Sequence, residues 1–194
     1  IEEEMWSKKA LFEQIAKHSP LSLIASNTSS LEIGVLSTFV PSPERFLGLH
    51  FFNPISVSRF VEIVPHSGTT SDSIAKAVDF VRKLSKEPVV TPDLPGFFIN
   101  SSLFPMLNHA AMAFALSNLT AKKFDHFFRQ SIGLNSGPLA TLDLIGLDTS
   151  LNILSSLHER EPGLHNPAAQ NIVDLVGRGE VGRKSGKGFH NYSF

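Results

Sequence analysis

The stretch Gly48-Leu49-His50-Phe51-Phe52-Asn53-Pro54, followed by Val61-Glu62-Ile63-Val64, decides the fold of this 194-residue chain. The flanking runs 46–52 and 59–64 are rich in aromatic and aliphatic residues, and each has the length of a strand. Asn53-Pro54 ends the first run, because proline cannot donate to a sheet ladder. His50 and Glu62 are therefore expected at strand ends, on loops outside a sheet, where α/β proteins place their chemistry.

The composition is that of a folded and nearly neutral protein. The chain is 42% hydrophobic and 18% charged, so it can bury a core. Its formal net charge is −1, without a basic stripe or an acidic block, so nucleic acid is not indicated as a partner. The absence of cysteine excludes disulfides, thiolate nucleophiles and zinc–sulfur sites. Neither an HExxH motif nor clustered histidines are present, so the sequence predicts no metal site.

Two segments bear on targeting and membranes. Residues 1–6 lack a positive region followed by an apolar core, so we expect no signal peptide. The first residue is Ile1 rather than methionine and already belongs to a helical pattern, so we expect a piece of a longer protein. Residues 94–121 carry no charged side chain and are long enough to span a bilayer. Asn100, Pro105 and Asn108 oppose that interpretation. A helix buried on all sides, in a core or a subunit interface, is predicted instead.

Helical and strand patterns alternate as far as about residue 92, which is typical of an α/β sheet. We expect helices over 2–18 and 70–85 and strands over 21–25, 46–52, 59–64 and 87–90. The polar loop 26–30 precedes a second apolar segment. Ser29 or Ser30 is expected to cap a helix there, whose N–H groups could hold an anion or a polar ligand, although an ordinary cap is the simpler interpretation.

The pattern changes at residues 91–96, where two prolines and a glycine interrupt the chain and strand patterns disappear. Four helices are expected beyond this point, over 97–116, 121–133, 137–157 and 167–177. A glycine-punctuated basic loop follows at 182–192. The sequence therefore predicts two domains, an α/β domain over 1–93 and an all-helical domain over 94–194.

His50 and Glu62 are the strongest candidates for chemistry. A histidine can abstract a proton near neutral pH, and a carboxylate on its other ring nitrogen fixes the tautomer and stabilises the imidazolium. The alternative is that His50 is an ordinary histidine and Glu62 a solvated edge residue. Asn100 is either an internal bridge or a ligand contact, and Lys184 either meets a phosphate or belongs to a solvated tail.

Five landmarks in order resemble the L-3-hydroxyacyl-CoA dehydrogenases, the NAD-dependent enzymes of fatty-acid β-oxidation. Together they cover nearly the whole chain, which makes the resemblance specific. They are Ser26-Asn27-Thr28-Ser29-Ser30-Leu31; the opening stretch with Val61-Glu62; Pro95-Gly96-Phe97 with Asn100; Gly137-Pro138 with Asp143-Leu144-Ile145-Gly146-Leu147-Asp148; and Lys184-Ser185-Gly186-Lys187-Gly188-Phe189.

The resemblance implies the C-terminal part of a Rossmann-type NAD-binding domain followed by a helical dimerisation and substrate domain. It implies NAD as the cofactor, an acyl-CoA substrate, a homodimer through the helical domain, and no membrane. By the resemblance, His50 matches the catalytic base and Glu62 the carboxylate that orients it, while Asn100 matches the asparagine near the reacting oxygen. Ser29 matches a serine that touches both cofactor and substrate. The residues matched to cofactor contacts are Glu3, Lys8, Asn27, Ser29, Asn53 and Lys184.

Two departures from the family pattern are visible. The family's N-terminal glycine-rich NAD-binding part is not found, so this chain alone is expected to be inactive. Ser101 and Asn108 stand where the family often has charged residues. This leaves open which acyl group is the substrate and whether CoA or another carrier holds it. The alternatives are a dehydrogenase of a carrier-protein-bound hydroxyacyl group in biosynthesis and a non-catalytic dimerising homologue. The expected location is cytoplasmic, or the mitochondrial or peroxisomal matrix in a eukaryote.

Overall fold

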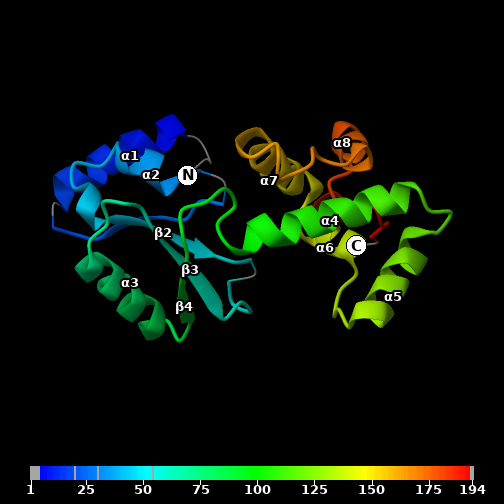
Figure 1. The fold of residues 1–194 in the computed structure, drawn as a ribbon, viewed down its shortest axis with the longest axis horizontal. Coiled ribbons are helices and arrows are strands. Elements are labelled where there is room, and N and C mark those ends of the chain that lie inside the picture. The colour runs from blue at the N-terminus through cyan, green and yellow to red at the C-terminus, as the bar shows by residue number, and fades with distance from the viewer. Residues whose placement is uncertain (1–4, 20, 30, 54, 193–194) are drawn as a thin grey trace. The chain divides into compact units, whose positions relative to one another are not determined.

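The computed structural model describes residues 5–19, 21–29, 31–53 and 55–192. The chain forms two compact units, Ile1–Phe98 and Ile99–Phe194. In the parts of the chain that the structure describes, the first unit combines helices with a sheet and the second consists of helices (Figure 1). The predicted fold class, α/β followed by all-α, is confirmed.

The sheet of the first unit has four strands in the order β1-β2-β3-β4. β1 runs parallel to β2, β2 antiparallel to β3, and β3 parallel to β4. Three predicted strands are confirmed to within one residue at each end, whereas the first begins later than predicted. The strands are β1 (Ile24–Ser26), β2 (Phe46–Phe51), β3 (Phe60–Pro65) and β4 (Glu87–Val90).

Helices α1 and α2 cover one face of the sheet and α3 covers the other (Figure 1). Side chains alternate between the two faces along β2: Phe46 packs with the α1 and α2 side, and Leu47 and Leu49 pack with the α3 side. Because the period of a strand is two, His50 falls on the same face as Phe46. The helical elements of this unit are α1 (Met5–His18), α2 (Ile33–Ser37), η1 (Pro43–Arg45) and α3 (Ser71–Lys83).

The start of α2 differs from the prediction. Ser29 and Ser30 were expected to cap the second helix, but α2 begins at Ile33, and its first N–H groups bond to the Asp93 carboxylate, Ile33 N at 3.0 Å and Gly34 N at 2.7 Å. A distant carboxylate thus takes the place predicted for a ligand, and the ligand interpretation of these N–H groups is wrong. The side chain of Thr70 caps α3, where it accepts the Ser73 N–H at 3.3 Å.

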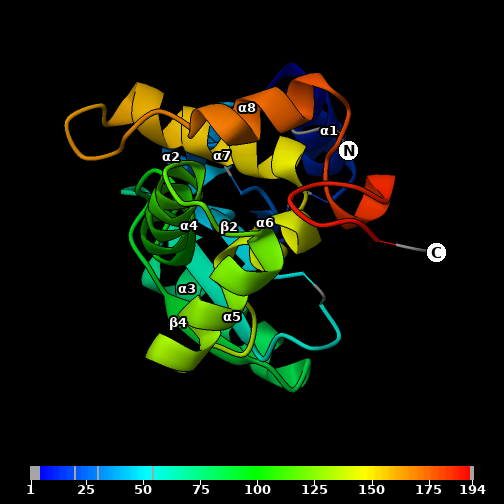
Figure 2. The same ribbon diagram turned by 90° about the vertical axis from the view of Figure 1, so that its right-hand side faces the viewer.

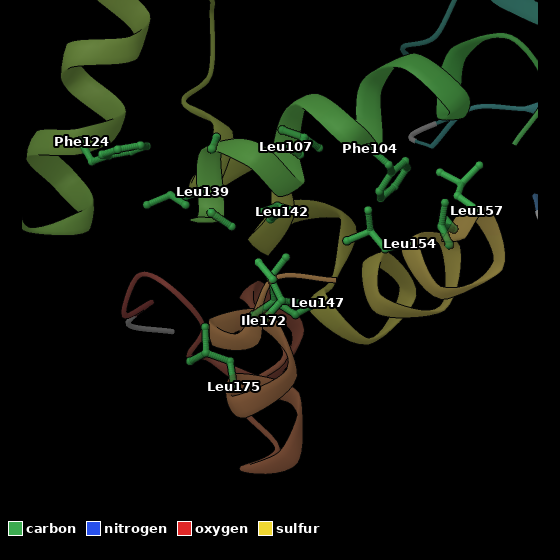
Figure 3. Packing of buried hydrophobic residues seen from close by; sticks show 14 residues of the cluster. Phe104, Leu107, Phe124, Leu139, Leu142, Leu147, Leu154, Leu157, Ile172 and Leu175 are labelled. Atoms are coloured by element: carbon green, nitrogen blue, oxygen red, sulfur yellow. The ribbon is translucent and has the colours of Figure 1, made fainter. Parts of the chain in front are cut away.

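The helices of the second unit surround one apolar core (Figure 3). Leu107 of α4, Leu139 and Leu142 of α6, and Leu154 of α7 are almost fully buried in it. Helix α8 packs beside α7 (Figure 2). The elements are α4 (Ile99–Ala115), α5 (Ala121–Ile132), α6 (Pro138–Ile145), α7 (Leu147–Arg160), α8 (Gln170–Gly177) and η2 (Arg183–Ser185).

The single helix predicted over 137–157 is wrong. Gly146, with φ of 101°, separates α6 from α7. This backbone conformation lies outside the helical region and is one that glycine adopts readily. The apolar pattern continues across the break, so periodicity alone did not reveal it.

Within the single chain, helix α4 is buried on one side, and burial of the other side in a subunit interface stays a prediction. Phe104, Leu107 and Ala111 face the core of the unit, whereas Met106 and Met112 are 39% and 42% exposed. The uncharged helix thus carries apolar residues on its buried side and on its exposed side. None of the helices in the described residues is long and apolar enough to cross a membrane.

The C-terminal segment is held by the buried carboxylate of Asp143. One oxygen accepts the Phe189 N–H at 3.0 Å, and the other accepts the His190 N–H at 2.9 Å and the Tyr192 hydroxyl at 3.0 Å. Burial, together with the negative Asp143, raises the pKa of Tyr192 to about 12. A Cβ at Gly188 would collide with the Asp143 carboxylate, so this close approach requires glycine.

Candidate active site

His50 and Glu62 form a direct, buried pair. They lie opposite each other in the antiparallel ladder of β2 and β3, which places their side chains on the same face of the sheet. His50 Nδ1 is 2.7 Å from Glu62 Oε2, and the two residues are 4% and 2% exposed. The expectation that they stand on loops is wrong, because both belong to paired strands. The interpretation of Glu62 as a solvated edge residue is likewise excluded.

The second oxygen of Glu62 is also bound. Glu62 Oε1 accepts the backbone N–H of Phe98 at 3.0 Å. Both carboxylate oxygens thus have partners, which fixes the plane of the carboxylate and offsets the cost of burying it. Sequence reasoning missed this contact, because a backbone donor 36 residues away leaves no mark on the residue pattern.

Two aromatic rings hold the imidazole. Phe52 and Phe97 meet the His50 ring edge-on, with centroid distances of 4.7 Å and 5.5 Å. Phe97 has a left-handed backbone with φ of 51°, directly after Gly96 with φ of 70°. A non-glycine residue in this region is uncommon and costs about 1–3 kcal/mol, and it persists where surrounding contacts impose it. Here the turn presents the Phe97 ring to His50 and the Phe98 N–H to Glu62.

The outer nitrogen of the imidazole faces Ser29. Ser29 Oγ lies 3.4 Å from His50 Nε2, at the long end of hydrogen-bond distance. With Nδ1–H donating to Glu62, Nε2 carries the lone pair and can take a proton from a bound hydroxyl group. Ser29 reaches this position because β1 runs parallel beside β2 and the loop after Ser26 leaves from the same edge.

Polar groups gather at the carboxyl ends of the parallel strands β1 and β2. Asn27 is exposed, and its Oδ1 accepts the Phe51 N–H at 3.1 Å; Asn53 is exposed just after β2. This is the edge of an α/β sheet at which nucleotides bind, and the amide donors there fit a dinucleotide. Lys8 of α1 is buried, while Glu3 lies outside the described residues, so the predicted pair of Glu3 and Lys8 stays a prediction.

The remaining predicted residues belong to the second unit. Asn100 is buried in the first turn of α4. Lys184 is not part of a solvated tail, because its ammonium group contacts Asp148 Oδ1 at 2.6 Å. Partial burial raises the pKa of Asp148, but hydrogen bonds from Lys184 and the Thr149 amide outweigh it and hold that pKa below its usual value.

Asn108, noted as a departure from the family pattern, has a structural explanation. Its Nδ2 donates to the Pro167 carbonyl at 2.9 Å, and its Oδ1 accepts the Ala169 N–H at 2.7 Å. The buried amide thus joins α4 to the segment before α8, and both of its polar groups are satisfied.

Both parts of the chain match one protein family. Residues 1–94 match the domain described as 3-hydroxyacyl-CoA dehydrogenase, NAD binding domain, and residues 96–192 match the C-terminal domain of the same enzymes. The chain belongs to the 3-hydroxyacyl-CoA dehydrogenase family. The predicted resemblance is confirmed, and the cofactor of this family's N-terminal domain is NAD.

Relatives agree with this membership. The mitochondrial hydroxyacyl-coenzyme A dehydrogenase of Mus musculus is 35% identical over 99% of this chain and 62% of its own length. A 3-hydroxybutyryl-CoA dehydrogenase of Bradyrhizobium diazoefficiens is 33% identical over 99% of this chain and 66% of its own. The chain therefore spans less than two thirds of these relatives.

Solved structures show the same fold. FadB2 of M. tuberculosis superposes with a TM-score of 0.95 at 32% identity, over 100% of this chain and 69% of that one. The (S)-3-hydroxybutyryl-CoA dehydrogenase PaaH1 of Ralstonia eutropha gives a TM-score of 0.91 at 32% identity, with the same coverage of both chains.

The prediction that the chain lacks the family's NAD-binding part is wrong. Residues 1–94 match the NAD-binding domain itself. The letters G-x-G-x-x-G do occur once in the chain, from Gly177 to Gly182. They follow helix α8 of the second unit and do not join a strand to a helix, so they lack the context of a dinucleotide-binding turn.

Proposed function

We propose that this chain supplies the acid–base pair of an NAD-dependent L-3-hydroxyacyl-CoA dehydrogenase, which oxidises the 3-hydroxyl group to a ketone. The buried contact of 2.7 Å between His50 Nδ1 and Glu62 Oε2 carries the proposal. A histidine so oriented presents a lone pair at Nε2. A purely structural protein has no need of this arrangement, which argues against a non-catalytic dimerising homologue.

The chemistry follows from the two ring nitrogens. His50 Nε2 takes the proton of the 3-hydroxyl group, and Glu62 stabilises the imidazolium that forms. Bound NAD would supply the acceptor for the hydride that leaves C3. In the reverse direction His50 returns the proton to the oxygen. Because Glu62 acts through His50, it is a positioning residue, and the Phe98 N–H bound to its other oxygen keeps it in place.

The remaining assignments rest on the resemblance together with residue chemistry. Ser29 and Asn100 can donate hydrogen bonds to the oxygen as it becomes a ketone. The exposed amides of Asn27 and Asn53 stand where a dinucleotide would bind. We keep Glu3, Lys8 and Lys184 as proposed cofactor contacts, and for Lys184 this would require exchange of its ion pair with Asp148.

We propose a 3-hydroxyacyl thioester of CoA as the substrate, in a fatty-acid β-oxidation type of reaction. The support is the names of the relatives, which act on hydroxyacyl-CoA and 3-hydroxybutyryl-CoA. The rival is a hydroxyacyl group on a carrier protein, which Ser101 and Asn108 first suggested. The structural bonds of Asn108 weaken that rival. A location in the cytoplasm, or in a mitochondrial or peroxisomal matrix, stays a prediction.

Steady-state kinetics separate the two substrates. The protein in its full natural length is assayed with L-3-hydroxybutyryl-CoA and with the same acyl group on acyl carrier protein, each with NAD and with NADP. We expect kcat/KM to be at least about tenfold higher with CoA and NAD, a difference of about 1.4 kcal/mol in transition-state stabilisation. A preference for the carrier-protein substrate would assign the enzyme to the rival reaction.

A further inference from the structure

A cavity of about 710 Å³ opens in the second unit beside helix α5. Its volume lies within the range of small-molecule sites. The side chains that line it include four lysines and arginines and two histidines, contributed by α5, η2 and the C-terminal segment. They are Lys122, Lys123, His126, Arg129, Arg183 and His190. The whole chain carries a net charge of −1, so the excess of positive charge at this cavity is local.

The cations of α5 in this cavity differ from three cations near the C-terminal end of the unit, which form ion pairs. Arg178 and Lys187 contact Glu180, and Lys184 contacts Asp148. No carboxylate among the described residues forms an ion pair with Lys122 or Arg129. Lys122 is four residues before His126 and Arg129 is three residues after it, so the three side chains lie on one face of α5. The charge they place at the cavity is therefore not neutralised by the described chain.

The carboxylate in the lining is already satisfied. Asp125 Oδ1 accepts the Leu139 N–H at 2.9 Å, and Oδ2 accepts the Ala140 N–H at 2.8 Å and contacts His190 Nε2 at 2.8 Å. It is the sole carboxylate among the described residues that line the cavity. Because its oxygens hold the start of α6 and the C-terminal segment, it does not compensate Lys122, Lys123 or Arg129.

The start of α5 adds a second source of positive potential. Lys122 and Lys123 stand in its first turn, which contains no acidic residue. Positive charges there are unfavourable, because the helix dipole already makes this end positive. An anion in the cavity would relieve both the dipole and the mutual repulsion of the lysines. Thr120, Asn135 and Ser136 also line the cavity and can donate hydrogen bonds to such an anion.

We propose that this cavity binds a small anion with two or more phosphate groups. Arginine binds phosphate through two parallel hydrogen bonds, and lysine supplies a point charge. Several cations at separate positions match a ligand with several phosphate groups better than a single phosphate. A concave site within a chain of negative net charge favours a small ligand over a nucleic-acid strand, which follows an extended basic stripe. The proposal is independent of the dehydrogenase chemistry, because it uses only residues of the second unit.

Calorimetric titration of the whole chain with inorganic tripolyphosphate at low salt tests the proposal. We expect saturable binding that weakens as salt is added, and weaker binding of pyrophosphate and orthophosphate in that order. Lys122→Gln and Arg129→Gln should each reduce the affinity at least about fivefold, with retained thermal stability because both side chains are exposed. Lys17→Gln removes the same charge from an exposed position of α1 and serves as the control. It should change the affinity for tripolyphosphate by less than about twofold.

Competition identifies the source of the phosphates. Displacement of tripolyphosphate by CoA but not by pantetheine assigns the site to the nucleotide end of CoA, whereas displacement by ATP but not by CoA assigns it to another phosphorylated metabolite. Either result supports the proposed chemistry. Absence of saturable binding would overturn it, as would equal affinities of the Arg129→Gln and Lys17→Gln variants. Tighter binding of a short oligonucleotide at the same residues would replace it with nucleic-acid binding.

Discussion

At the scale of single residues, the sequence predicts a candidate catalytic pair but not the contacts that hold it. His50 and Glu62 are twelve residues apart, and that spacing suits either a hairpin or two loops, so only the register of β2 and β3 decides between them. The contacts that fix the pair come from the turn at Phe97 and Phe98. Such contacts depend on tertiary structure, and a linear pattern does not encode them.

The proposed role of Glu62 as a positioning residue can be tested directly. Glu62→Gln keeps the shape of the side chain but removes the negative charge that stabilises the imidazolium, so we expect kcat to fall at least about tenfold with KM changed less than about twofold. Glu87→Gln serves as the control, because Glu87 is an exposed strand carboxylate paired with Arg59. Equal rates for the two variants would contradict the assignment.

At the scale of elements, periodicity predicts most strands and helices but fails where a single residue changes the backbone. The runs over 46–52 and 59–64 emerge as strands whose apolar residues are mostly buried in the sheet. The run over 87–90 forms the edge strand, which pairs with β3 although Val89 and Val90 are exposed. The break at Gly146 was missed, because an apolar helix pattern tolerates glycine in principle. The start of α2 was misassigned because its cap, Asp93, lies about sixty residues away in the sequence.

The contact between α5 and the C-terminal segment predicts a pH dependence of stability. The hydrogen bond from His190 to Asp125 raises the pKa of His190 above its ordinary value, more than burial and Arg183 lower it. Because the folded-state pKa is raised, the stabilisation is fully present below the unfolded-state value of about 6.5 and is lost as pH rises through the raised value. Thermal unfolding between pH 6 and 9 measures this effect.

We expect the unfolding midpoint of the unmodified protein to decrease by a few degrees over this pH range, and that of His190→Gln to decrease less. His18→Gln, at the exposed end of α1, is the control and should follow the unmodified protein. A His190→Gln profile parallel to that of the unmodified protein would show that the bond to Asp125 contributes no pH-dependent stability.

At the scale of the whole molecule, the chain is a sheet unit followed by a helical unit, and the family match extends over both. The sequence predicted the change from an α/β to an all-helical fold class, since strand patterns end where two prolines and a glycine interrupt the chain at residues 91–96. The uncharged helix was harder to interpret. Its sequence gives two apolar sides, and only the fold shows that one side packs in the unit while Met106, Met112 and Leu116 remain exposed.

The exposed side of α4 predicts a homodimer contact, since apolar side chains gathered on one surface mark interaction sites. Met112→Glu introduces charge into this surface and should raise the dimer dissociation constant at least about tenfold, or about 1.4 kcal/mol. Analytical ultracentrifugation measures the dissociation constant of the dimer. Gln130→Glu, at an exposed position of α5, is the control. A monomeric unmodified protein, or a dimer unaffected by Met112→Glu, would contradict this interface.

The central claim is that His50 is the general base of a 3-hydroxyacyl-CoA dehydrogenase. The most direct test is kcat for NAD-dependent oxidation of L-3-hydroxybutyryl-CoA by the His50→Gln variant of the full-length protein, beside a His66→Gln control whose ring contacts the Pro43 carbonyl. Loss of a general base lowers kcat at least about a hundredfold, and this is the result we predict for His50→Gln, with the control near the unmodified rate. A near-unmodified rate in a folded His50→Gln protein would contradict the claim.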